Sequence, residues 1–106
     1  MFASVLVVDL HLPVTDSLKA KRAVITPILE GARRRHRVAV SEVAFQDQWQ
    51  RSELAFATVG SSEQQAREVL DAVERFVWSF PEVEVLGARR FWAEDEDAPV
   101  DAEERD

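Results

Sequence analysis

Hydrophobic and polar residues alternate in four segments of the chain and recur at helical spacing in two others. The alternating segments are rich in β-branched and aromatic residues, which is typical of strands, and cover residues 2–12, 38–46, 53–60 and 83–92. The helical pattern, with apolar residues three and four positions apart, covers residues 17–37 and 62–80. The pattern therefore predicts the element order β-α-β-β-α-β.

The simplest closure of this order is an α+β fold, the ferredoxin-like sandwich. In it, two helices cover one face of a four-stranded antiparallel sheet, and each βαβ unit crosses over right-handedly. The first strand supports this interpretation, because one face is apolar at Leu6, Val8 and Leu10, whereas the other carries Asp9 and His11. A strand with one apolar and one mixed face indicates a sheet that is covered on one side only.

The first predicted helix contains two residues that disturb it. Either Asp16 or Ser17 can cap its start. Pro27 removes a backbone donor, which predicts a kink in the preceding turn, or else a split into two helices with Thr26 as the second N-cap. Gly31 weakens the second half by about 1 kcal/mol relative to Ala.

The second helix and the last strand carry clearer local signals. Ser61 or Ser62 caps the helix, and each is followed three residues later by a Gln, which is a capping-box arrangement. In the last strand, Gly87 predicts a β-bulge. The short polar link after residue 46 predicts a hairpin between the second and third strands.

The composition indicates one domain with an acidic end. The chain has 106 residues, which is the length of one domain, and no Cys, which excludes disulfides and thiolate chemistry and is typical of the cytoplasm. The net charge of -7 lies entirely in residues 93–106, which hold eight acids and one base. That segment has too few apolar residues to offset the entropy of ordering it. We therefore expect a domain at 1–92 and an acidic, disordered tail at 93–106, which is either solubilising or folds back and competes with nucleic acid.

Basic residues gather in the first predicted helix. Residues 17–37 contain seven bases and one acid, Glu30. In a continuous helix, four of the bases fall within a sector of about 60°, with Arg34 further round. Such a stripe either binds phosphates or is an ordinary solvated face with cations at the helix C-terminus. The candidate RNA-binding residues are Lys19, Lys21, Arg22, Arg33, Arg34 and Arg37.

Catalytic, metal and cofactor chemistry has no support in the residue pattern. The only two His, His11 and His36, belong to different predicted elements, and His36 closes an apolar stripe. The chain contains no nucleophile elbow, and its three Gly form no phosphate-binding loop. We therefore expect no enzyme activity, no cofactor and no metal.

The polar link between the second and third strands contains one large aromatic residue. Trp49, with Gln50 and Arg51 beside it, can stack on a base, plug an edge of the core or anchor a subunit contact. The composition of the segment leaves these three interpretations open.

Two blocks of sequence resemble a known bacterial family. The segment Ser17-Leu18-Lys19-Ala20-Lys21-Arg22 is similar to its S-L-K-x-K-R motif. The segments Val40-Ser41-Glu42-Val43 and Gln46 to Leu54 are similar to its V-[SA]-E-V and Q-D-x-W-Q motifs. The family is the YlxP-like family, domain of unknown function number five hundred and three, and the resemblance covers residues 1–92. It implies a ferredoxin-like fold, no established activity or cofactor, and a gene context of translation initiation and ribosome maturation.

The combined expectation is a cytoplasmic accessory protein that contacts ribosomal RNA or a ribosomal subunit through its first helix. No membrane contact and no DNA sequence recognition are expected. The alternative is a homo-oligomeric protein-interaction module without a nucleic-acid role. Its contact would be the open sheet face, with Val5, Val7, Ala55, Ala57 and Val59.

Overall fold

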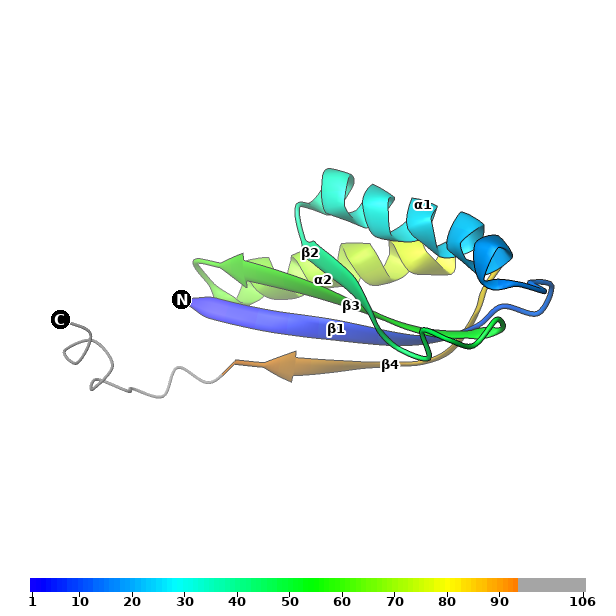
Figure 1. Ribbon diagram of the computed structural model, residues 1–106. Helices are drawn as coiled ribbons and strands as arrows, with labels where there is room; N and C mark the ends of the chain where they lie inside the picture. Colours follow the sequence, from blue (N-terminus) through cyan, green and yellow to red (C-terminus); the bar gives the residue numbers. More distant parts are fainter. Residues whose placement is uncertain (94–106) are drawn as a thin grey trace, which may run out of the picture.

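The computed structural model describes residues 1–93 and contains all six predicted elements (Figure 1). The strands are β1 (Phe2–His11), β2 (Ala39–Ala44), β3 (Arg51–Gly60) and β4 (Glu84–Trp92), and the helices are α1 (Leu18–His36) and α2 (Glu63–Trp78). The main difference from the predicted bounds is that β2 ends two residues early. Phe45 has a φ of 64°, which is incompatible with an extended strand, so the chain turns there.

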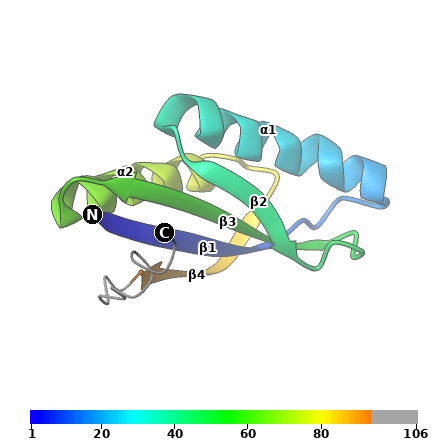
Figure 2. The same cartoon turned by 60° about the vertical axis from the view of Figure 1, so that its left-hand side comes forward.

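The four strands form one antiparallel sheet in the order β2-β3-β1-β4. Both helices lie on the same face of this sheet, and the opposite face is uncovered (Figures 1 and 2). The α+β, ferredoxin-like sandwich predicted from the element order is therefore confirmed. The core fills the space between the sheet and the helices, with Leu6, Val8, Leu10, Ile28, Phe56 and Leu70 among its fully buried residues.

The predicted bulge in the last strand is present. Asp9 of β1 faces Gly87 whereas Leu10 faces Val85, so Leu86 is the extra residue of β4. Beyond the bulge, Arg90 faces Leu6 and lies on the helix side, where it bonds Asp71 (2.8 Å) and Glu74 (2.9 Å) of α2. Burial alone would lower the pKa of Arg90, but the hydrogen bonds to Glu74 and Asp71 and the negative charges of these two residues together outweigh it, and the net shift is upward.

Helix α1 runs without a break through Pro27, so the split into two helices is wrong. Pro27 has no N–H to donate to the carbonyl of Ala23, four residues earlier. Both residues are exposed, so water can bond this carbonyl instead. Ser17 caps the start, accepting from the backbone N–H of Ala20 (3.0 Å). The helix ends at Arg37, which adopts the left-handed conformation with a φ of 56°.

Ser62 caps helix α2, one of the two predicted caps, but the returning bond of the predicted capping box goes to the N–H of the residue before the cap. Ser62 accepts a hydrogen bond from the N–H of Gln65 (3.1 Å), and the Gln65 side chain accepts in return from the N–H of Ser61 (2.9 Å). At its other end, the ring of Phe76 packs against Gly31 of α1. A Cβ at position 31 would lie 2.5 Å from Cζ of Phe76, so the glycine permits this close approach.

The predicted acidic tail, apart from Ala93, lies outside the described residues. The N–H of Ala93 bonds the carbonyl of Ala3 (2.9 Å), which ties the end of β4 to the start of β1. Neither helix within residues 1–93 has the length and apolarity that crossing a bilayer requires.

Candidate functional site

Lys21, one of the candidate RNA-binding residues, is buried, so its ammonium group cannot contact an external ligand. Only 1% of the residue is accessible to solvent. It lies four positions before Ile25 and seven before Ile28, which are both buried, so all three share the face of α1 that meets the sheet. This spacing was visible in the sequence and could have identified Lys21 as an inward-facing residue.

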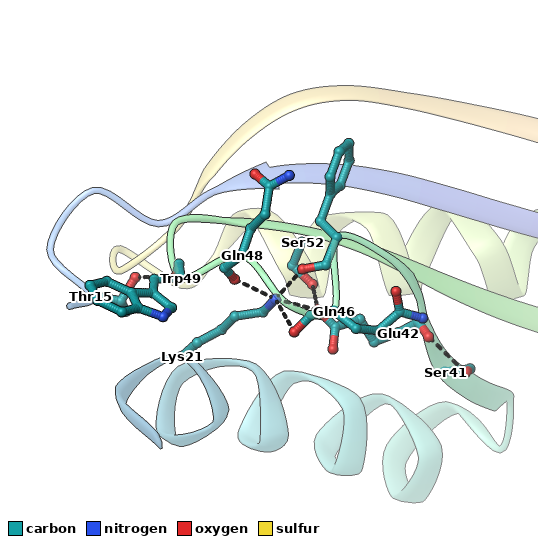
Figure 3. A network of polar contacts seen from close by, with 9 residues as sticks. Thr15, Lys21, Ser41, Glu42, Gln46, Gln48, Trp49 and Ser52 are labelled. Atoms are coloured by element: carbon teal, nitrogen blue, oxygen red, sulfur yellow. Dashed lines mark hydrogen bonds and ion pairs between the residues drawn. The ribbon is translucent and has the colours of Figure 1, made fainter. Parts of the chain in front are cut away.

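The ammonium group of Lys21 is held between α1 and the loop that joins β2 to β3 (Figure 3). Its Nζ lies 2.7 Å from Oε2 of Glu42 and donates to the carbonyls of Phe45 (2.7 Å) and Gln48 (2.8 Å). The hydroxyl of Ser52 donates to the same carboxylate oxygen (2.8 Å). A buried cation needs this saturation by charge and hydrogen bonds, and here it fixes the path of the loop.

A second set of bonds ties the β2–β3 loop to the loop between β1 and α1. The hydroxyl of Thr15 lies 2.6 Å from the carbonyl of Trp49 and 3.0 Å from that of Leu12. The Gln50 side chain donates to the carbonyl of Thr15 (3.2 Å), and the carbonyl of Gln50 accepts from the N–H of Leu12 (2.9 Å). Gln50, predicted as an interface or stacking residue, therefore bonds the neighbouring loop.

The Trp49 side chain is exposed at the tip formed by these two loops. Its exposed fraction is 53%, and Val14, on the β1–α1 loop, is 80% exposed. The interpretation of Trp49 as a plug at the edge of the core is therefore wrong. Stacking on a base and contact with another protein both remain compatible with its position.

Arg51 lies apart from Trp49, on the uncovered face of the sheet. Its guanidinium bonds both carboxylate oxygens of Asp9 (3.0 and 3.2 Å) and stacks over the ring of Phe45, 4.4 Å from the centroid. The three residues predicted together as interface or stacking residues therefore have different surroundings: Trp49 is exposed at the tip, Gln50 bonds the β1–α1 loop, and Arg51 lies on the sheet face. Arg51 stabilises the start of β3 and the turn at Phe45.

The other basic residues of the first helix region are exposed. Arg33 pairs with Glu30 (2.6 Å), and the hydrogen bond from Arg33 is the main cause that lowers the pKa of that carboxyl. Five cations have no carboxylate partner among residues 1–93, namely Lys19, Arg22, Arg34, Arg35 and Arg37. Arg35 was not among the predicted residues, although it continues the Arg33-Arg34 run.

The exposed cations divide between two sides of α1. Because α1 is continuous, Lys19, Arg22 and Arg33 fall within one sector of about 60° at 100° per residue, as predicted, and none of the three lines the groove between the helices. Arg34 and Arg35 instead line an open groove of about 480 Å³ between α1 and α2, with Pro27, Glu30, Gly31, Phe76 and Phe80. Arg37 is the C-cap of α1 and adopts the left-handed conformation, so it does not share the predicted sector of basic residues with Lys19, Arg22 and Arg33.

The uncovered face of the sheet has a small apolar centre and paired charges toward one end. Val5 and Val7 of β1 face Ala57 and Ala55 of β3. Toward the His11 end of β1, two ion pairs lie on this face, Asp9–Arg51 (3.0 Å) and Glu53–Arg89 (3.3 Å), together with a hydrogen bond between His11 and Glu84 (2.7 Å). The carboxylates of Asp9 and Glu53 are therefore neutralised by arginines within the chain.

Among residues 1–93, no group of three His, Asp or Glu side chains is close enough to hold a metal ion. His11 pairs with Glu84, and His36 packs edge-on against Phe76 with 5.8 Å between ring centroids. Both imidazoles therefore have contacts that account for their positions.

Known proteins resemble the chain across nearly all of the described residues. The profile of a family described as "Protein of unknown function (DUF503)" matches residues 3–90. The uncharacterized protein YlxP of Bacillus subtilis (strain 168) is 42% identical over 76 residues, which cover 72% of this chain and 83% of that protein. A de novo designed protein with a ferredoxin fold, solved by NMR, aligns over 92% of this chain and 89% of its own, at 11% identity and a TM-score of 0.48.

Proposed function

The chain belongs to the DUF503 family of proteins of unknown function, and we propose that it is a non-enzymatic cytoplasmic accessory protein that binds structured RNA. Ribosomal RNA, free or within a subunit, is the expected target. The exposed cations of α1 and of its C-terminal end form the binding surface. Lys21 is not part of this surface, because its ammonium is buried.

One observation carries the proposal: five cations on α1 and its C-cap are exposed and have no carboxylate partner within residues 1–93. From Lys19 to Arg34 they extend over about 22 Å of helix. Although they lie on two sides of the helix, these cations can contact several phosphates of one folded RNA, and each contact releases counterions.

The helix macrodipole accounts for only part of this charge. Arg34, Arg35 and Arg37 lie at the C-terminal end, where cations are stabilised by the dipole. Lys19 and Arg22 lie in the first turns, where the dipole disfavours cations and where α1 has no acidic residue. A ligand of negative charge is therefore the better explanation for the five cations together.

The direct test is co-sedimentation with ribosomal subunits, together with fluorescence anisotropy on a labelled fragment of structured ribosomal RNA. We expect binding that weakens steeply with salt. The triple variant Arg22→Glu/Arg34→Glu/Arg37→Glu should lose it, because three attractive contacts become repulsive.

A matched control uses the second helix. Arg75→Glu on α2 makes the same change of charge as Arg22→Glu, at another exposed helical arginine. Arg22→Glu should weaken RNA binding and Arg75→Glu should leave it nearly unchanged. If Arg22→Glu and Arg75→Glu change RNA affinity equally, or if the triple variant still binds RNA, α1 does not have the proposed role.

A second candidate function, self-association, is favoured by the uncovered sheet face. Its centre is apolar at Val5, Val7, Ala55 and Ala57, and the carboxylates beside it are already paired within the chain. Two copies could therefore meet there without burying an unpaired charge.

Sedimentation equilibrium up to high micromolar concentration tests this candidate. A dimer that Ala57→Glu dissociates would support it, since the substitution places a charge in the apolar centre. A monomer throughout the concentration range would reject it. RNA binding and self-association use different faces and can be tested independently.

A further inference from the structure

The indole ring of Trp49 is presented to solvent by a loop that the fold holds firmly. The carbonyl of Trp49 accepts from Thr15, and the carbonyl of Gln48 accepts from Lys21 (Figure 3). On the other side of Trp49, the carbonyl of Gln50 accepts from the N–H of Leu12. The backbone at the tip is therefore anchored at three successive residues. An exposed aromatic residue on an anchored backbone loses little entropy when it binds a ligand.

The fold does not require an indole at this position. The bonds of Gln48, Trp49 and Gln50 to Lys21, Thr15 and Leu12 are made by backbone carbonyls, which any residue could supply. Half of the ring surface is in water, where a large apolar side chain contributes little to stability. The residue type is therefore better explained by an external contact than by folding.

Charged side chains of both signs surround the tip, which makes a polar ligand a better fit there than an apolar protein surface. Lys19 and Arg22 flank Lys21 in the sequence and are exposed, while Lys21 itself reaches into the Trp49 loop. Both cations therefore belong to the first turns of α1, the end of the helix that Lys21 joins to the Trp49 loop, and they are exposed there on a different side of the helix from Lys21. The exposed carboxylates of Asp16 and Asp47 are also near the two loops, and they would keep phosphates on the α1 side.

From this arrangement we propose that Trp49 stacks on an unpaired base of an RNA strand whose phosphates follow Lys19 and Arg22 along α1. The inference rests on the proposed function and makes it more specific, because the ligand must contain a single-stranded or looped segment. Stacking on an aromatic ring tolerates any base, so the contact selects unpaired RNA rather than a sequence.

The test uses a Trp78→Phe/Trp92→Phe background, in which Trp49 is the only indole. Titration with oligouridine or with a ribosomal RNA loop should quench its fluorescence, and a fully paired duplex should not. In the otherwise unchanged protein, Trp49→Ala should weaken binding of the looped RNA roughly 5- to 150-fold. Trp49→Phe should restore most of the affinity.

Trp78→Ala is the matched control, because Trp78 is 61% exposed and lies at the end of the other helix. If the wild type binds RNA and the Trp49→Ala and Trp78→Ala variants bind it with equal affinity, the stacking role is overturned and the proposed function still stands. No RNA binding by the wild type would overturn both. If Trp49→Ala leaves RNA affinity unchanged but abolishes binding of a protein partner, the tip is a protein contact instead.

Discussion

The Nζ of Lys21 and the Oε2 of Glu42 lie 2.7 Å apart in the interior, with side chains only 2% and 18% exposed. Lys21 belongs to the S-L-K-x-K-R segment and Glu42 to the V-S-E-V segment, so two blocks that resemble the family motifs meet in this pair. The pair connects α1 with β2 and the loop that carries Trp49. These motif residues therefore build the scaffold of the tip, and only some of the motif cations remain available to a ligand.

Replacing Lys21 should be strongly destabilising. Lys21→Met leaves the partly buried carboxylate of Glu42 without its cation and the carbonyls of Phe45 and Gln48 with fewer donors, which we expect to cost about 3–5 kcal/mol. Urea denaturation measures the loss. Lys19→Met, at an exposed position two residues earlier, should change stability by less than about 0.5 kcal/mol. Similar effects of the two substitutions would contradict the buried role of Lys21.

Gly31→Ala should destabilise the protein even though alanine is the better helix former. The added Cβ meets the ring of Phe76, and overpacking of this kind costs about 1–3 kcal/mol, against about 1 kcal/mol gained in helix propensity. In a Phe76→Leu background the clash is relieved, and the same substitution should become stabilising. Thermal unfolding of the four proteins in this cycle gives the sign directly, and stabilisation in the wild-type background would contradict the close approach.

Arg37→Gly should separate stability from RNA binding. Glycine adopts the left-handed conformation of residue 37 without penalty, so the variant should gain about 1 kcal/mol in the free energy of unfolding. At the same time it removes one exposed cation, and the salt slope of RNA binding should fall by about 1. Arg37→Lys, which keeps the charge, serves as the control for binding. A more stable variant with unchanged RNA affinity would exclude residue 37 from the binding surface.

Glu30 should titrate below its ordinary pKa of 4.5, because Arg33 bonds its carboxylate. A lowered pKa in the folded state means that the pair stabilises the protein above the unfolded pKa. This contribution disappears as the pH falls through the folded pKa. Carbon-detected NMR of the carboxyl group measures the shift, and Arg33→Gln should return it toward the ordinary value. An unshifted Glu30 in the wild type would show that the pair does not persist in solution.

Removing residues 94–106 should tighten RNA binding at low salt. The segment carries all of the net negative charge, so the shortened chain is nearly neutral and repels phosphates less. The gain should vanish at high salt, where charge interactions are screened. Equal affinity of the full and shortened chains at low ionic strength would show that the segment does not affect binding.

The local features of the fold could be predicted because they depend on neighbouring residues. The alternation in β1 and the spacing of apolar residues in α2 reflect which face is buried, and the capping by Ser17 and Ser62 involves residues three positions away. Pro27 was harder to judge, because the effect of a proline depends on whether the freed carbonyl meets water. That outcome follows from the packing of α1 on the sheet.

The sequence by itself determined the order of the elements, the composition of each face and the total charge of the first helix region. Only the tertiary structure decided which of those charges are available. Lys21 and Lys19 are two positions apart, yet the carbonyls that hold Lys21 lie 24 and 27 residues further along the chain and are brought to it by the β2–β3 turn. Burial of a charge depends on such distant partners, and a one-dimensional pattern records the spacing of residues but not the path of the chain between them.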